Sequence, residues 1–247
     1  MATSAESKRV LILGGKDGLL GLSLAAACAN GGYEVHVTGP GDLDFSGAPG
    51  CQNISDMLDK VKPDFLFNTV AYTQVDQAEE DEEKAYELNR FLPALLGRAV
   101  KGRDCALLHY STDFVFDGRK SSPYTTEDLP APASVYRKSK LAGEEALAKL
   151  DADNICSIRT AWLFGPRKKN FVRTILELCA KQSGVNVVHD QVGSPTYTED
   201  LAVYSLKLAE AGGRGLFHIA NSGSASWAEL AAEAARLTQS ECVITPI

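Results

Sequence analysis

Tyr136 and Lys140 stand four residues apart in the segment VYRKSKLAGEEAL, which has strong helical character. Residues with this spacing share one face of a helix, with Cβ atoms roughly 5–6 Å apart. A tyrosine hydroxyl has an ordinary pKa of about 10, and a neighbouring ammonium group lowers that pKa toward the range useful for proton transfer. The pair could therefore act as an acid–base unit, although an exposed helix with an accidental Tyr and Lys is the commoner explanation of this spacing alone.

A second polar segment, HYSTDFVFDG, places Ser111, Thr112 and Asp113 at the end of a predicted strand. Ligands of open α/β sheets bind at this end of the strands. The Thr112 hydroxyl could polarise a substrate carbonyl there. Together, Thr112, Tyr136 and Lys140 indicate a proton-donating set suited to the reduction of a ketone.

Three glycines spaced three apart, Gly15, Gly18 and Gly21, lie between an apolar run at 10–13 and an alanine-rich helical pattern at 19–30. In this strand-turn-helix context, the N–H groups and the dipole of a helix start can receive a pyrophosphate. The spacing differs from the usual G-x-G-x-x-G fingerprint, and an ordinary tight turn with close helix packing is the alternative. The context favours a bound nucleotide.

The apolar runs of the sequence predict the strands and helices that position these polar segments. Further strands are predicted at 33–37, 64–70, 105–111, 154–164, 185–190 and 215–220, with helices at 54–61 and from 77 onward. This alternation predicts an α/β fold with a Rossmann-type doubly wound parallel sheet. The polar, proline-containing stretch at 120–134 is predicted to be a loop.

Composition narrows the class of protein. The 247-residue chain is 45% hydrophobic and carries a net charge of −7, which argues against binding to nucleic acid. The six cysteines are scattered without zinc-ligand spacing, so we expect no metal site and small buried thiols in a reducing compartment. No segment resembles a secretory signal or a membrane span, which predicts a cytoplasmic protein without membrane partners. The acidic run at 79–83 is interpreted as a solvated helix start.

Seven segments together resemble a known family. In chain order they are the glycine segment 15–21, DFS at 44–46, AYTQVDQAE at 71–79, STDFVFDG at 111–118, YRKSKLAGE at 136–144, RTAWLFG at 159–165 and DQVGSPT at 190–196. Over nearly the whole chain this combination resembles the extended short-chain dehydrogenases/reductases, and within them the dTDP-4-dehydrorhamnose reductase family. The Tyr-x-x-x-Lys pair is generic to the superfamily, whereas STDFVFDG and DQVGSPT are much more specific to this branch.

The resemblance implies a role for each matching residue. The catalytic set would be Thr112, Tyr136 and Lys140, with Lys140 also touching the nicotinamide ribose. The cofactor would be held by Gly15, Gly18, Leu19, Leu20 and Gly21 at the pyrophosphate, Asp44, Phe45 and Ser46 near the adenine, Ala71 and Tyr72 along the groove, and Tyr136 and Lys140. The sugar-nucleotide substrate would meet Thr73, Val75, Asp113, Phe114, Trp162, Gln191 and Pro195.

The implied activity is reduction of the C4 ketone of a nucleotide-linked 4-keto-6-deoxy sugar. The end of the second strand, HVTGPG, lacks an acidic residue that would grip the ribose of NAD, which favours NADPH. It also lacks an arginine for the extra phosphate, so the preference is weak and NADH is the alternative cofactor. The implied fold is a Rossmann domain over 8–160, with later strands returning to it, and a mainly substrate-binding small C-terminal lobe over 161–247.

One alternative function belongs to another class. The regulatory subunit of methionine adenosyltransferase resembles the same reductase branch and binds NADP without catalysis. The intact Thr, Tyr and Lys set favours the enzyme. A homodimer is left open as the assembly state.

The chain also departs from the family pattern. Gly14 replaces a usual Thr, Phe114 replaces a usual Tyr, and NTVAY at 68–72 replaces a more alanine-rich segment. The loss of a hydroxyl at Phe114 leaves the identity of the sugar open. Relatives commonly continue beyond the position of Ile247, so we expect part of the substrate lobe to be absent.

Overall fold

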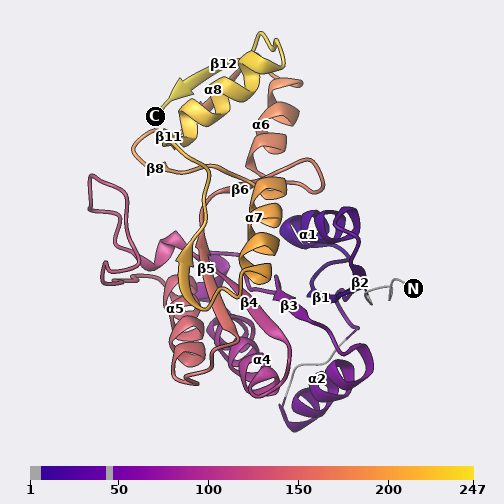
Figure 1. The fold of residues 1–247 in the computed structure, drawn as a ribbon. Coiled ribbons are helices and arrows are strands. Elements are labelled where there is room, and N and C mark those ends of the chain that lie inside the picture. Colours follow the sequence, from indigo (N-terminus) through magenta and orange to yellow (C-terminus); the bar gives the residue numbers. More distant parts are fainter. Residues whose placement is uncertain (1–6, 43–46) are drawn as a thin grey trace.

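A six-stranded parallel sheet forms the centre of the computed structural model, which describes residues 7–42 and 47–247 (Figure 1). Its strand order is β2 (Glu34–Val37), β1 (Arg9–Leu13), β3 (Phe65–Asn68), β4 (Ala106–Thr112), β5 (Ile155–Thr160) and β10 (Gly215–His218). Because β2 and β3 lie on opposite sides of β1, the winding reverses between β1 and β3. The predicted doubly wound sheet is confirmed, and the reversal marks the edge where such sheets bind ligands.

The apolar residues of β1 alternate between two cores. Val10 and Ile12 pack under α1 (Leu19–Asn30) and α7 (Thr198–Glu210) on one face of the sheet. Leu11 and Leu13 pack on the other face, which is covered by α2 (Gly47–Val61), α4 (Leu92–Val100) and α5 (Val135–Ala148). Both faces of the strand are therefore buried, which explains its uniformly apolar sequence.

The long helix predicted from residue 77 is divided into four pieces, and that prediction is wrong in this respect. The 3-10 turn η1 (Gln77–Glu79), α3 (Glu82–Tyr86) and the π-helical turn η2 (Glu87–Phe91) precede α4. Pro93 has no N–H to donate to the carbonyl of Asn89, so the regular hydrogen-bond pattern is interrupted there. π-helical turns of this kind occur frequently at functional sites.

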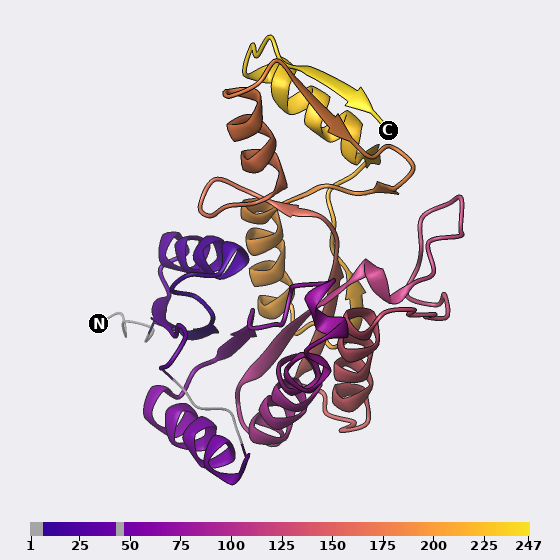
Figure 2. The same cartoon turned by 180° about the vertical axis from the view of Figure 1, so that it is seen from behind.

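The C-terminal part of the chain has a small core of its own at one end of the molecule (Figure 2). It contains α6 (Phe171–Cys179), α8 (Trp227–Leu237) and the parallel pair β7 (Gly184–Val187) and β12 (Val243–Pro246). Two short pairs connect it to the sheet: β6 (Leu163–Phe164) with β9 (Thr196–Tyr197), and β8 (Val192–Gly193) with β11 (Ala225–Ser226). Between them, α7 and β10 return to the main sheet. No helix among the described residues has both the length and the apolar character needed to cross a membrane.

Helix α5 lies unusually close to the π-helical turn. A side chain at Gly143 would overlap the backbone carbonyl oxygen of Asn89, and Pro93 is the next neighbour. Overpacking of this kind forces the backbone to move, since the overlapping atom is not the end of a flexible side chain. Glycine at this position therefore determines how closely α5 approaches the turn.

We expect Gly143→Ala to lower the free energy of unfolding by about 1–3 kcal/mol, measured by chemical denaturation. Gly184→Ala is the matched control, because a methyl group there would lie 3.5 Å from its nearest neighbour, the Val243 carbonyl oxygen. If Gly143→Ala and Gly184→Ala have equal free energies of unfolding, α5 can move away from the π-helical turn without loss of stability.

Candidate active site

The glycine turn after β1 lets the start of α1 pack closely against the backbone of the turn at Gly14. Gly14 has φ of +79°, a conformation that favours glycine, and its carbonyl accepts a hydrogen bond from the Gly18 N–H at 2.9 Å. A side chain at Gly18 would lie 2.7 Å from the same oxygen, and one at Gly21 would overlap it. The glycines therefore permit close helix packing, and Gly14 takes the left-handed position of the turn.

The N-terminus of α1 is left free for a ligand. Gly18 occupies the capping position and offers no side-chain acceptor. Within the described part of the chain, the first-turn N–H groups of Leu19, Leu20 and Gly21 have no backbone acceptor either. Unpaired N–H groups at the positive end of a helix dipole, beside the reversal of the sheet, fit the pyrophosphate of a dinucleotide.

A charged pair lies at the end of β2. The Lys16 Nζ and Asp42 Oδ2 atoms are 2.6 Å apart, and Asp42 also accepts a hydrogen bond from the Gly39 N–H at 2.8 Å. Lys16 and this N–H lower the pKa of the Asp42 carboxyl. The strand end thus has both an acid and a cation nearby, which the sequence analysis did not anticipate because they lie outside the segment HVTGPG.

The segment after β3 forms the other side of the predicted cofactor groove. Ala71 is half-buried and Tyr72 is buried, while Thr73 is exposed and Val75 half-buried. Their assignment to cofactor and substrate stays a prediction. Asp44, Phe45 and Ser46, predicted near the adenine, lie outside the described residues.

Asn89 holds this segment to α5 and was missed by the sequence analysis. Its Oδ1 accepts a hydrogen bond from the Tyr72 N–H at 2.9 Å, and its Nδ2 donates to the Tyr72 carbonyl at 3.1 Å. Nδ2 also lies 3.0 Å from the hydroxyl of Ser139 on α5. An Asn four residues before a proline, inside a helical pattern, is the signal that could have revealed it.

The structure brings Thr112 and Tyr136 together. Thr112 ends β4, and Tyr136 lies in the first turn of α5. Burial raises the pKa of Tyr136 to about 12, and the Thr112 hydroxyl lowers it while the Asp113 charge raises it further. The expected lowering by Lys140 does not occur in this structure: the influences on the phenol are burial, Thr112 and Asp113, and the Lys140 ammonium is bonded to the Tyr110 carbonyl instead.

Lys140 lies one turn further along the same helix and is 3% exposed. Its ammonium group donates a hydrogen bond to the Tyr110 carbonyl of β4 at 2.6 Å. Burial lowers the pKa of Lys140 to about 8, and the Glu144 charge opposes this lowering. The ammonium group is therefore directed at the sheet beside Thr112.

The start of α5 is anchored from two sides. Ser134 caps the helix by accepting from the Arg137 N–H, and the Glu79 carboxylate accepts from the Val135 N–H at 2.8 Å. The acidic run at 79–83 therefore includes a contact that positions the turn containing Tyr136, and Glu82 and Glu83 begin α3 as expected. No cluster of three metal-ligating side chains occurs among residues 7–42 and 47–247.

Two predicted substrate residues lie against Tyr136. The rings of Phe114 and Tyr136 meet edge to face with centroids 6.4 Å apart, and the Arg137 guanidinium lies 5.0 Å from the Phe114 ring centroid. Burial raises the pKa of Asp113 to about 6. An aromatic surface and a neutralisable carboxyl group therefore border the phenol.

The remaining predicted substrate residues gather in the C-terminal part. Trp162 adopts a left-handed φ of +48° and stacks on Trp227 with ring centroids 3.5 Å apart. The Trp227 indole N–H lies 3.3 Å from Gln191 Oε1, and Pro195 lies half-buried on the same loop. Trp162 follows Thr160, which is in register with Thr112, so this aromatic stack begins at the catalytic edge of the sheet.

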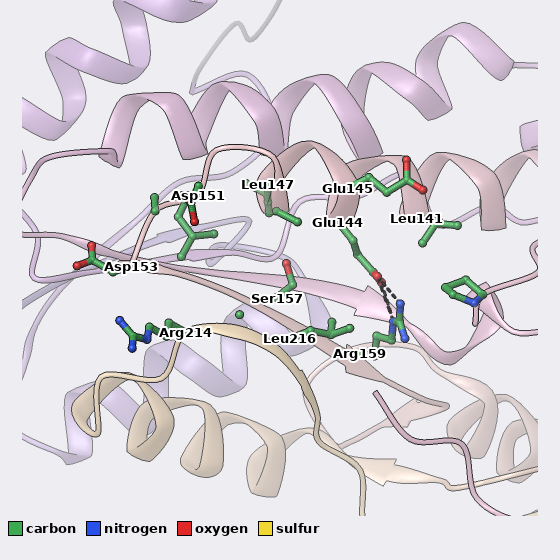
Figure 3. A pocket seen from close by; sticks show the side chains of 15 residues that line it. Leu141, Glu144, Glu145, Leu147, Asp151, Asp153, Ser157, Arg159, Arg214 and Leu216 are labelled. Atoms are coloured by element: carbon green, nitrogen blue, oxygen red, sulfur yellow. Dashed lines mark hydrogen bonds and ion pairs between the residues drawn. The ribbon is translucent and has the colours of Figure 1, made fainter. Parts of the chain in front are cut away.

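A cavity of about 850 Å³ lies behind the candidate site, not in it. Figure 3 shows that it lies between α5 and the strands β5 and β10, with Leu147 and Leu216 on opposite walls. Neither the glycine turn nor Tyr136 and Lys140 line it. Glu144 and Arg159, which form an ion pair, line the cavity, and Glu144 lies one turn beyond Lys140 on α5.

Comparison with known proteins gives a consistent family. The family model described as RmlD substrate binding domain matches residues 8–247. The chain belongs to this family of extended short-chain dehydrogenases/reductases. It is 37% identical to dTDP-4-dehydrorhamnose reductase of Aggregatibacter actinomycetemcomitans, covering 90% of this chain and 76% of that protein. A probable dTDP-4,6-dihydroxy-2-methyloxan-3-one 4-ketoreductase of Streptomyces antibioticus is also 37% identical, covering 93% and 77%.

A solved RmlD-family structure has the same fold. The dTDP-4-dehydrorhamnose reductase of Bacillus anthracis, crystallised in complex with NADP, superimposes with a TM-score of 0.92 at 32% identity. The match covers 98% of this chain and 84% of that one. Most of the relative's chain therefore has a counterpart here.

Two departures from the RmlD-family pattern fit together in space. The Thr69 hydroxyl donates to the Leu13 carbonyl at 2.6 Å, linking β3 to β1 at the reversal of the sheet. A side chain at Gly14 would lie 2.7 Å from that hydroxyl oxygen. Glycine at 14 therefore makes room for the threonine that stands in the segment NTVAY.

We expect the stability effect of Asp113→Asn to depend on pH. Because the folded chain raises the pKa of Asp113 from 3.8 to about 6, it binds this proton more tightly than the unfolded chain does. The charged carboxylate therefore costs stability above pH 6, and the cost disappears as the pH falls to about 4. Asp113→Asn should raise the unfolding free energy by about 1–3 kcal/mol at pH 7.5 and leave it unchanged at pH 4.

Denaturant titrations at the two pH values provide the measurement. Asp76→Asn, at an exposed carboxylate, is the control and should show no such difference. A variant that is no more stable than the parent at pH 7.5 would mean that Asp113 is solvated rather than desolvated.

Proposed function

We propose that this chain uses NADPH to reduce the C4 ketone of a nucleotide-linked 4-keto-6-deoxy sugar, with dTDP-4-dehydro-L-rhamnose as the first substrate to test. The contact between Thr112 and Tyr136 at the carboxyl end of β4, with Lys140 one turn further along α5 and bonded to the Tyr110 carbonyl, supports this proposal. The relatives named above reduce dTDP-linked substrates according to their names, which supports both the nucleotide and the ketone.

Residues of the chain would donate the proton and set the acidity of the donor. The bound nicotinamide would supply the hydride. Tyr136 would donate a proton to the ketone oxygen, and Thr112 would hold that oxygen by a hydrogen bond. Lys140, one turn further along α5, would supply a positive charge that favours loss of the Tyr136 proton, in addition to the lowering of the Tyr136 pKa by the Thr112 hydroxyl.

The glycine turn and the end of β2 support NADPH as the cofactor. The free N–H groups of α1 would hold the pyrophosphate, and Lys16 would supply a cation for the 2′-phosphate. Asp42 would have to release Lys16 for that role. Without a phosphate, Asp42 could accept from a ribose hydroxyl, which leaves NADH usable.

The substrate would lie between the Tyr136 region and the C-terminal part. Asp113 and Phe114 border the phenol, and Trp162, Gln191 and Pro195 would meet the sugar nucleotide along with Thr73 and Val75. A mainly substrate-binding role for 161–247, a cytoplasmic location and a homodimer stay predictions. The regulatory-subunit alternative is less favoured, because the relatives named above are reductases.

We expect Tyr136→Phe to lower kcat on a dTDP-linked 4-keto sugar by about 10²–10⁴-fold, because general acid catalysis contributes that much. NADPH affinity should stay within a few-fold of the parent value, since only one oxygen is removed. Steady-state kinetics and calorimetric titration of NADPH measure the two quantities.

Tyr204→Phe, at a tyrosine that is 57% exposed on α7, is the matched control. It should leave both quantities unchanged. Full activity of Tyr136→Phe with a verified substrate would assign the proton donor to another group, whereas a parent that binds NADPH and reduces nothing in a broad panel of such sugars would favour the regulatory function.

We expect Lys16→Met to weaken NADPH binding at least tenfold, about 1.4 kcal/mol, while NADH affinity changes little. The reason is that the cation is lost while the Asp42 carboxylate stays and repels the 2′-phosphate. Lys8→Met, at the opposite end of β1, is the control for loss of a lysine. An equal loss for NADPH and NADH would place Lys16 away from the 2′-phosphate.

A further inference from the structure

Helix α5 carries three polar residues in one line. Tyr136, Lys140 and Glu144 follow each other at four-residue spacing, so they share a face of the helix. Lys140 is 3% exposed and Glu144 is 7% exposed. Tyr136 and Lys140 belong to the proposed site, whereas Glu144 lies beyond it and has no role there.

Arg159 of β5 clamps the Glu144 carboxylate. Its Nε donates to the two carboxylate oxygens at 3.0 and 3.1 Å, and its Nη2 donates to Oε2 at 2.7 Å (Figure 3). The buried Nη1 finds no partner within the described part of the chain. All hydrogen bonds of this guanidinium therefore go to one carboxylate, which fixes the position of Glu144.

The same guanidinium contacts the chain between the two catalytic segments. Its central carbon lies 4.9 Å from the ring centroid of Phe116, and Phe116 stacks on Tyr124 with centroids 4.1 Å apart. Phe116 lies four residues after Thr112. The loop that contains Tyr124 comes next and leads into the helix with Tyr136. The ion pair thus joins α5, β5 and the segment that separates Thr112 from Tyr136.

Stability alone does not account for a buried ion pair here. The desolvation of two charges often offsets their attraction, so apolar residues of similar volume are commonly as stable or more so. The neighbouring walls of the cavity are already apolar at Leu141, Leu147 and Leu216. A charged pair at this place therefore points to an electrostatic role.

That role concerns Lys140. The titratable groups around it are Tyr136 and Glu144 on α5, His109 and Tyr110 on β4, and Arg159 on β5. Among the described residues, Glu144 is the carboxylate that acts on Lys140, and it opposes the lowering of the Lys140 pKa by burial. His109 is buried and its pKa is lowered, so it adds no compensating charge.

We propose that Glu144, held by Arg159, is a positioning residue that keeps Lys140 in its charged form and directed at the Tyr110 carbonyl. The catalytic consequence rests on the proposed function, because the charge of Lys140 matters to turnover only if Tyr136 is the proton donor. The effect on Lys140 itself does not depend on that function.

A pH titration of carbon-13-labelled lysine by NMR tests the proposal directly, with the Lys140 signal assigned from Lys140→Met. The parent should titrate near pH 8. Glu144→Gln should lower this midpoint by about one pH unit or more, a tenfold change in the ionisation constant. Glu144→Asp keeps the charge and should restore most of the shift, and the exposed neighbour Glu145→Gln is the matched control.

The alkaline limb of the pH profile of kcat/KM should move to lower pH in parallel. If Glu144→Gln does not fold because Arg159 is left unpaired, the double variant Glu144→Gln, Arg159→Gln is compared with Arg159→Gln, and the double variant should have the lower Lys140 midpoint of the two. A Lys140 midpoint equal to that of the parent in the folded variant overturns the proposal. A shifted midpoint in a protein that reduces no sugar supports it and contradicts the proposed function instead.

Discussion

The carboxamide of Asn89 connects the two sides of the candidate site. It is fully buried, and it binds both backbone groups of Tyr72 and the Ser139 hydroxyl of α5. Its own carbonyl lies against Gly143, because Pro93 cannot supply the regular helical donor. The helix with Tyr136 and Lys140 is therefore attached to the segment after β3, and the predicted cofactor groove and proton donor cannot shift independently.

Burial drives the side chains around the phenol toward their uncharged forms. It raises the pKa of Tyr136 to about 12 and of Asp113 to about 6, and it lowers that of Lys140 to about 8. Desolvation has this direction for acids and bases alike. A site of this kind depends on the groups that oppose desolvation, which here are the Thr112 hydroxyl beside the phenol and the Glu144 carboxylate beside the ammonium.

Local patterns in the sequence predicted many of the helices and strands. They could not predict the contacts between segments that are distant in the chain. The bounds of α1 agree with its helical pattern, and the apolar run at 10–13 lies within β1. Thr112 and Tyr136 meet because a strand end and a helix start each have a recognisable local signature. Asn89, by contrast, acquires its role from Tyr72 and Ser139, and Ser139 lies 50 residues away. The contact between Glu79 and the start of α5 spans 56 residues and has no local signature either.

The fit between Gly14 and Thr69 bears on how this turn can change over evolutionary time. The hydroxyl of Thr69 occupies the space that a side chain at position 14 would need, and it ties β3 to β1 through Leu13. A side chain at 14 would meet both a left-handed backbone and the Thr69 hydroxyl, so the effect of a substitution there depends on the residue at 69 and the two positions are epistatic. Variants built by copying single residues from homologues into this turn will consequently underestimate how many sequences it can accept.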